Sequence, residues 1–123
     1  MVNYKDLLIL RLSSIVEWKN EREMIIPEEM HRGFSWYDTC EFLGDGKYIL
    51  RDYYKNGSPR RKEEYQNEQQ HGFDLGWWPS GRPYWKIEYQ NRLRHGYTIY
   101  WDESGNKYID EEYKNGRWIR SIK

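Results

Sequence analysis

Hydrophobic and polar positions alternate along most of the chain after residue 45, and the same alternation returns every 24 residues. Runs rich in aromatic and β-branched residues, bounded by Asn, Gly, Ser or Pro, are typical of short β-strands separated by turns. The pattern therefore predicts an antiparallel meander. One type of strand is predicted at residues 60–65, 84–89 and 108–113, and a second type at residues 73–78 and 97–102.

The 24-residue spacing is an internal repeat. When residues 53–76 are placed over residues 77–100, nine of the 24 columns are identical, and a third copy begins at Trp101 and ends before its His-Gly pair. A period of this length is typical of stacked units that bury their apolar faces against their neighbours. We predict an all-β, elongated, single-layer sheet of stacked β-hairpins. Repeat columns predicted to be structural hold Gly57, Gly81 and Gly105; Tyr65, Tyr89 and Tyr113; His71 and His95; and Gly72 and Gly96.

The turns and faces of the sheet follow from the same columns. The Gly57 column is predicted to adopt positive φ in tight turns. Period-two alternation predicts that Phe73, Leu75 and Trp77 form a packed side, because these positions stay apolar in the next copy. In the first strand type the Tyr65 column shares its face with Trp85, Ile87 and Ile109, with Lys and Glu residues behind it.

The chain divides at residue 45. Residues 46–56 repeat the first strand type, so residues 46–123 are predicted to form the repeat array. Residues 1–45 are predicted to be a degenerate repeat or a short helical cap. We favour degenerate strands, since residues 17–21 resemble 64–68 and residues 31–34 resemble 71–73; a helix over residues 7–18 is the alternative.

Composition excludes several classes of partner. Lys plus Arg and Asp plus Glu each total 20, and the opposite charges are interleaved, so no extended basic field exists for nucleic acid or an anionic membrane. The hydrophobic fraction is only 37%, but 7 Trp, 12 Tyr and 3 Phe supply rings for a thin sheet. A single cysteine, Cys40, and an apolar start too short to span a bilayer predict a cytoplasmic protein of a bacterium or an infected host cell.

The segment 89–105, Tyr-Gln-Asn-Arg-Leu-Arg-His-Gly-Tyr-Thr-Ile-Tyr-Trp-Asp-Glu-Ser-Gly, resembles the MORN repeat, which places a Tyr six residues before a His-Gly pair. The resemblance covers residues 46–123 well. It is closest to the variant type found in bacterial proteins sometimes described as antitoxins, and in phages and large DNA viruses. The resemblance implies an elongated sheet of hairpins used for binding. The lipid association reported for the family is not carried over, because no basic surface supports it here.

Candidate catalytic and metal chemistry is weak in this sequence. His71 and His95 share one column, but no Cys or acidic residue is spaced to complete a metal site, and each imidazole is predicted to hydrogen-bond a turn. Cys40 and His31 lack an orienting group. Neighbouring glutamates on a strand face opposite ways, so they form no catalytic pair. We therefore predict no enzyme activity, no metal and no cofactor.

Aromatic residues outside the constant columns are the better candidates for function. Trp78, Tyr84, Tyr100 and Tyr108 are predicted to bind a protein partner, because Trp and Tyr most often anchor protein interfaces. Equally, they could pack on the N-terminal segment or shield the second side of the sheet. The predicted role is an adaptor or assembly component. An antitoxin, immunity or counter-defence inhibitor is the alternative, and self-association through the C-terminal sheet edge is a further expectation.

Overall fold

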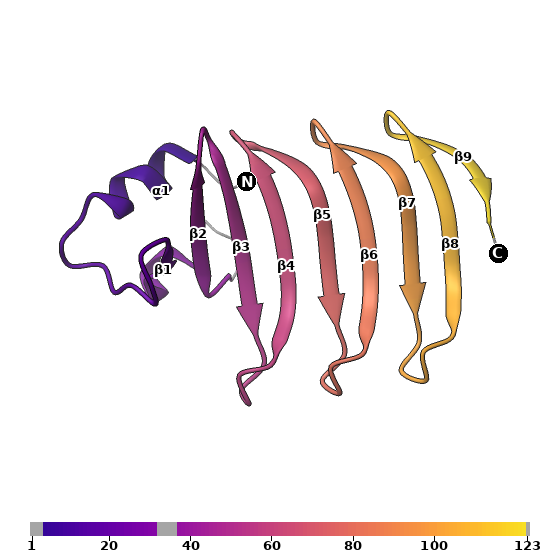
Figure 1. Ribbon diagram of the computed structural model, residues 1–123, viewed down its shortest axis with the longest axis horizontal. Helices are drawn as coiled ribbons and strands as arrows, with labels where there is room; N and C mark the ends of the chain where they lie inside the picture. The colour runs from indigo at the N-terminus through magenta and orange to yellow at the C-terminus, as the bar shows by residue number, and fades with distance from the viewer. Residues whose placement is uncertain (1–3, 32–36, 123) are drawn as a thin grey trace.

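Among the residues that the structure describes, one antiparallel sheet of nine strands forms most of the protein, with the strands in chain order (Figure 1). The computed structural model describes residues 4–31 and 37–122. The strands lie side by side in a single elongated layer, which confirms the predicted all-β meander. They are β1 (Glu23–Ile25), β2 (Thr39–Gly44), β3 (Lys47–Tyr53), β4 (Pro59–Gln66), β5 (Gln69–Trp77), β6 (Pro83–Gln90), β7 (Leu93–Trp101), β8 (Lys107–Lys114) and β9 (Arg117–Ser121).

The second strand type begins four residues earlier than predicted, because the His-Gly pairs lie inside β5 and β7. Both strands carry a register shift near these pairs, and Gly72 has φ of 110°. A Cβ on Gly72 would overlap the carboxylate of Glu64, which accepts a hydrogen bond from the Phe73 amide at 2.5 Å. The glycine therefore lets a carboxylate lie against the neighbouring backbone.

The third copy is more complete than predicted. The third copy was predicted to end before its His-Gly pair, but β9 continues through those two columns and pairs with β8 as the closing strand of the array. Ile119 and Arg120 occupy the columns of His-Gly. The Arg120 guanidinium forms an ion pair of 2.7 Å with Glu112, the equivalent of Glu64. An exposed charge pair thus replaces the carboxylate-over-glycine contact of the inner units, and β9 leaves its outer edge open.

Two kinds of turn join the strands. The five-residue connections after β3, β5 and β7 contain Gly57, Gly81 and Gly105, each with φ between 90° and 93°, which confirms the predicted positive φ. The two-residue turns within the hairpins begin at Asn67, Asn91 and Asn115, which all adopt left-handed φ. Asn tolerates this region better than most residues.

Hydrogen bonds between successive units hold these turns in place. The Nδ1 atom of His71 accepts from the Asn91 amide, and that of His95 accepts from the Asn115 amide, both at 3.3 Å. The prediction that each histidine hydrogen-bonds a turn is confirmed, although the turn is that of the following unit. At the other end of the strands, the Tyr54 hydroxyl donates to the Trp77 carbonyl at 2.6 Å.

The apolar residues of the two strand types lie on opposite faces of the sheet. Asp74 and Gly76 pair with Ile87 and Trp85, whereas Phe73 pairs with Glu88, and paired residues share a face. Asp74 also pairs with Glu63, which shares its face with Tyr65, so we call the face of Asp74, Ile87 and Trp85 the Tyr65 face. The opposite face is the Phe73 face. On the Tyr65 face Ile87 is 4% exposed, whereas Phe73 is 37% exposed on the other.

The prediction that Phe73, Leu75 and Trp77 form the packed side is therefore wrong. The alternation within β5 does not reveal the register with β6. That register places Phe73 opposite Glu88 and Leu75 opposite Lys86, beside charged side chains. The predicted grouping of Trp85 and Ile87 with the Tyr65 column is confirmed by the same register.

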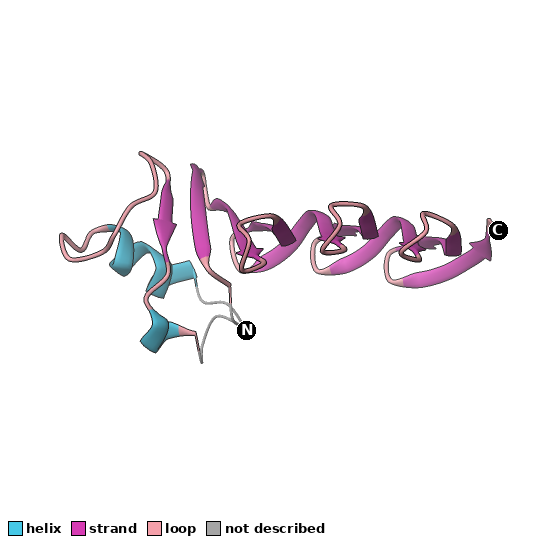
Figure 2. Ribbon diagram, turned by 90° about the horizontal axis from the view of Figure 1, so that it is seen from below, coloured by secondary structure: helices cyan, strands magenta, loops and turns pink. Residues whose placement is uncertain are grey.

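The first described element of the N-terminal segment is a helix, α1 (Tyr4–Arg11), so our preference for degenerate strands over residues 1–45 is wrong at residues 4–11. The alternative, a helix over residues 7–18, extends too far, since the helix ends at Arg11 and β1 and β2 lie later in the same segment. Leu7 is fully buried while Ile9 is 67% exposed, whereas a strand would place these two side chains on the same face. The short strand β1 follows, and then a 3-10 turn, η1 (Glu28–Met30). The expected match of residues 31–34 to 71–73 lies largely outside the described residues. Figure 2 shows both helical segments at one end of the sheet.

The hydrophobic core lies at this end. α1 and β1 to β3 enclose it, and Tyr4, Tyr48 and Tyr65 stack with ring centroids 5.4 Å and 5.1 Å apart. Among the described residues, the N-terminal segment therefore covers the Tyr65 face over β3 and β4, and the core cluster that it forms extends no further along the sheet than Tyr65. The buried members of the cluster are Leu7, Val16, Met24, Ile26, Tyr37, Cys40, Phe42, Tyr48 and Leu50.

Candidate functional site

The four aromatic residues predicted to bind a partner lie together in one cluster. Tyr84 stacks on Trp78 with ring centroids 3.8 Å apart, and the ring of Tyr100 is 6.1 Å from those of Tyr84 and Tyr108. Trp85 completes the group, at 5.0 Å from Tyr84. These five residues, which we call the aromatic cluster, come from two successive units at the loop end of the Tyr65 face.

The aromatic cluster is accessible but firmly held. Tyr108 is 48% exposed and the other four rings are half-buried. The Trp78 indole donates to the Trp101 carbonyl at 3.2 Å, and the Trp85 indole donates to Asp74 at 2.8 Å. Rings held by neighbours lose little side-chain entropy on binding, which favours their use as interface anchors.

An open hollow of about 450 Å³ adjoins the aromatic cluster. Sequence reasoning did not predict it. Its walls combine rings from two successive units with two guanidinium groups, a lining that supports binding of a side chain with both apolar and polar parts. The lining residues are Tyr54, Arg60, Arg61, Trp77, Tyr84 and Trp85.

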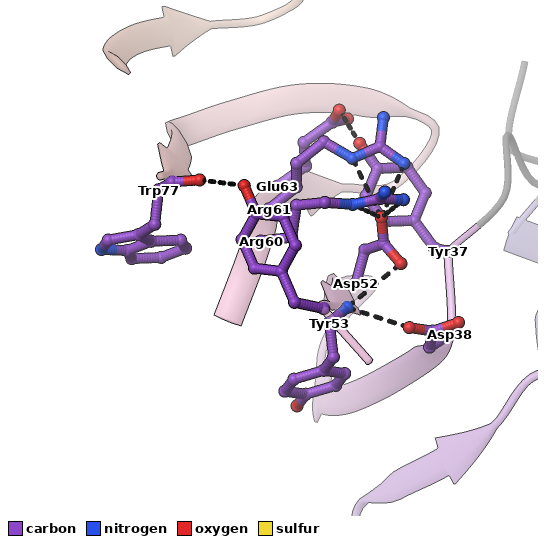
Figure 3. A network of polar contacts seen from close by, with 9 residues as sticks. Tyr37, Asp38, Asp52, Tyr53, Arg60, Arg61, Glu63 and Trp77 are labelled. Atoms are coloured by element: carbon purple, nitrogen blue, oxygen red, sulfur yellow. Dashed lines mark hydrogen bonds and ion pairs between the residues drawn. The ribbon is translucent and has the colours of Figure 1, made fainter. Parts of the chain in front are cut away.

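Asp52 holds the two arginines of the hollow in place (Figure 3). Its Oδ2 atom accepts from Arg60 and from Arg61, the latter at 3.0 Å from Nη2. Burial acts to raise the pKa of Asp52, but hydrogen bonds from Asp38 and from both arginines lower it below its usual value. Asp38 in turn has its pKa raised by burial and by that hydrogen bond. Asp52 is therefore the more acidic carboxyl group of the two.

A second carboxylate pair lies next to this network on the Tyr65 face. Glu63 and Asp74 face each other across β4 and β5. The hydroxyls of Tyr37 and Tyr65 both donate to Glu63. Burial, followed by the charge of Glu63, raises the pKa of Asp74 to about 6, although the Trp85 indole opposes the shift. Asp74 therefore changes its charge close to neutral pH.

Asp74 should make the stability of the protein depend on pH. Its pKa is higher in the folded chain than its ordinary value of 3.8, so its contribution is full below pH 3.8 and is lost as the pH rises through about 6. We expect Asp74→Asn, whose amide oxygen still accepts from Trp85, to raise the melting temperature relative to the native chain at pH 7 but not at pH 4. Thermal unfolding of both proteins from pH 4 to pH 7 measures this difference.

The matched control is Asp102→Asn on the exposed connection after β7. Asp102 is half-buried and accepts from the Ser104 and Asn106 amides of its own loop, so this variant removes a carboxylate that lies outside the pair of Glu63 and Asp74. A constant difference for Asp74→Asn would contradict the raised pKa.

Cys40 lies in the core and not in a site. It is fully buried, and burial raises the pKa of its thiol far above the ordinary value. A protonated, enclosed thiol is a poor nucleophile. We expect iodoacetamide to leave the folded protein unmodified and to add one carbamidomethyl group in urea, as measured by intact mass. Modification at equal rates under both conditions would show that Cys40 is accessible in the folded state.

The histidine column does not gather metal ligands. Within residues 4–31 and 37–122, no group of three or more His, Cys, Asp or Glu side chains is placed to hold a metal ion. His71 and His95 each use Nδ1 to accept from the backbone of the next turn. Their place in the fold is explained by these contacts.

Comparison of this chain with known proteins identified no relative. Neither the family models, nor the curated proteins, nor the solved structures include a match to this chain. In the described part of the chain, the helices are too short or too polar to cross a membrane.

Proposed function

We propose that this chain is a non-enzymatic, MORN-like repeat protein that binds another protein through the aromatic cluster. The contiguity of Trp78, Tyr84, Trp85, Tyr100 and Tyr108 on the uncovered part of the Tyr65 face is the observation that supports this proposal. Trp and Tyr are enriched at binding hot spots, and clustered rings that neighbours hold in place are suited to that use.

The alternative, that these rings pack on the N-terminal segment, has less support. That segment contacts Tyr48 and Tyr65, whereas the aromatic cluster lies on β6 to β8 and the connection after β5. Its rings contact one another and the backbone of the neighbouring unit. An adaptor or assembly role follows most directly from a long sheet with one covered end and one free face.

The test compares two double variants of the full chain. Trp78→Ala with Tyr100→Ala removes two rings of the aromatic cluster, while Phe73→Ala with Tyr97→Ala removes two rings from the opposite face of the same strands. Partners captured from the source cell by the native chain should be lost by the first variant and kept by the second. Circular dichroism establishes that both variants are folded. Equal capture by both would overturn the proposal.

A further inference from the structure

The hollow beside the aromatic cluster has an unusual lining. Its only charged lining residues are two arginines, Arg60 and Arg61, and its remaining walls are the rings of Tyr54, Trp77, Tyr84 and Trp85. The nearby carboxylates of Glu63 and Asp74 do not line it, and both accept hydrogen bonds from surrounding side chains. The hollow therefore offers positive charge next to flat apolar surface.

The two guanidinium groups retain binding capacity. Both lie against one oxygen of Asp52. Arg61 also interacts electrostatically with Asp74, so Arg60 is the arginine with less negative charge beside it. Asp52 engages only Nε and Nη2 of each arginine, and a guanidinium carries five N–H donors. The Arg60 side chain is 43% exposed, whereas that of Asp52 is 3% exposed. An incoming anion can thus reach Arg60 without displacing Asp52.

The rest of the chain limits what that anion can be. Net charge is zero and charges of both signs are interleaved, so a polyanion such as nucleic acid finds no extended field beyond the hollow. The volume of about 450 Å³ suits one or two side chains. A single carboxylate beside an aromatic ring satisfies both the charge and the walls, since Arg binds carboxylates with two parallel hydrogen bonds and rings pack against rings.

We propose that the hollow binds an acidic segment of a protein partner, with an Asp or Glu carboxylate on Arg60 and Arg61 and an adjacent aromatic side chain between Tyr54 and Tyr84. This inference rests on the proposed function, because it names the chemistry of the partner that the neighbouring aromatic cluster would contact. Charge complementarity carries it, because Asp52 holds the exposed Arg60 guanidinium at a hollow whose lining has no carboxylate and whose other walls are aromatic.

The test uses small probes and nuclear magnetic resonance of the full chain. N-acetyl-phenylalanine carries both a ring and a carboxylate, its amide lacks the carboxylate, acetate lacks the ring, and phenyl phosphate replaces the carboxylate with phosphate. We expect N-acetyl-phenylalanine to shift the Arg60 Nε–H and the indole signals of Trp77 and Trp85 saturably, and the amide and acetate to shift them at least about tenfold more weakly.

Variants assign the binding to the hollow. Arg60→Gln should weaken N-acetyl-phenylalanine binding by about tenfold, because it removes a charge-assisted contact while Arg61 keeps Asp52 paired. Arg22→Gln, at an exposed position of the N-terminal segment, should leave binding unchanged. Equal binding by the amide, unchanged binding by Arg60→Gln, a response to phenyl phosphate alone, or no saturable shift with any probe would each overturn the inference.

Failure here is distinct from failure of the proposed function. If the probes do not bind but the Trp78 and Tyr100 double variant still loses its captured partner, the partner lacks the acidic anchor and the aromatic surface stands. If the probes bind while partner capture is unaffected by that variant, the hollow is a carboxylate site and the aromatic cluster is not the interface.

Discussion

Replacing Leu50 with alanine is expected to lower the free energy of unfolding by about 3 kcal/mol. Leu50 is fully buried in the centre of β3, paired with Cys40 on β2, and belongs to the core that α1 closes. Removing its side chain loses apolar burial and leaves a cavity between a sheet and a helix that can close only in part. Urea unfolding followed by far-ultraviolet circular dichroism measures the change.

Leu93→Ala is the matched control. Leu93 lies on the array at the start of β7 and is 46% exposed, so its truncation should cost no more than about 0.5 kcal/mol. A similar cost for both variants would show that the stability of the chain is spread along the array instead of resting on the N-terminal core.

Gly76→Ala is expected to cost about 2 kcal/mol, within the usual range for overpacking. Gly76 pairs with Trp85 across β5 and β6, and the indole ring occupies the space that a Cβ on Gly76 would fill. An added Cβ would come within 2.5 Å of the ring atom Cδ2 of Trp85, so the ring must move. Its hydrogen bond to Asp74 and its contact with Tyr84 would then weaken. Thermal unfolding and the Trp85 indole resonance measure both effects.

A double-mutant cycle separates the overlap from other effects of the methyl group. In a Trp85→Ala background the ring is absent, so Gly76→Ala should cost much less than in the native chain. Gly81→Ala provides a second comparison, because Gly81 has φ of 93° but nothing within 4 Å of an added Cβ. If Gly76→Ala costs the same with and without Trp85, the indole ring is not the reason for the glycine.

The array was largely predictable from sequence because its contacts are local and repeated. Tyr65, Tyr89 and Tyr113 recur in register, and each first-type strand pairs with the strand that follows it. The helix was harder to predict. In α1 only Leu7 is fully buried while Ile9 is 67% exposed, so its amphipathic pattern is too weak to distinguish helix from strand.

The aromatic cluster and the hollow differ in how far sequence could predict them. Trp78, Tyr84, Tyr100 and Tyr108 were found as residues that depart from the constant columns, and the sheet brings them together. The hollow could have been found in the same way, because two paired columns of the repeat change their residue type from one unit to the next. In the column of Asp52 the next units have Gly76 and Tyr100, and opposite them stand Arg61, Trp85 and Ile109.

The amino-acid sequence by itself determined the repeat, the hairpin meander and the glycine positions, because strand alternation and turn conformation depend on residues close together in the chain. Only the tertiary structure decided which face is packed, where the core lies and which side chains surround the hollow. Those outcomes depend on register between strands and on the docking of α1, which bring Tyr4 and Tyr65, distant in the sequence, against the same ring, that of Tyr48.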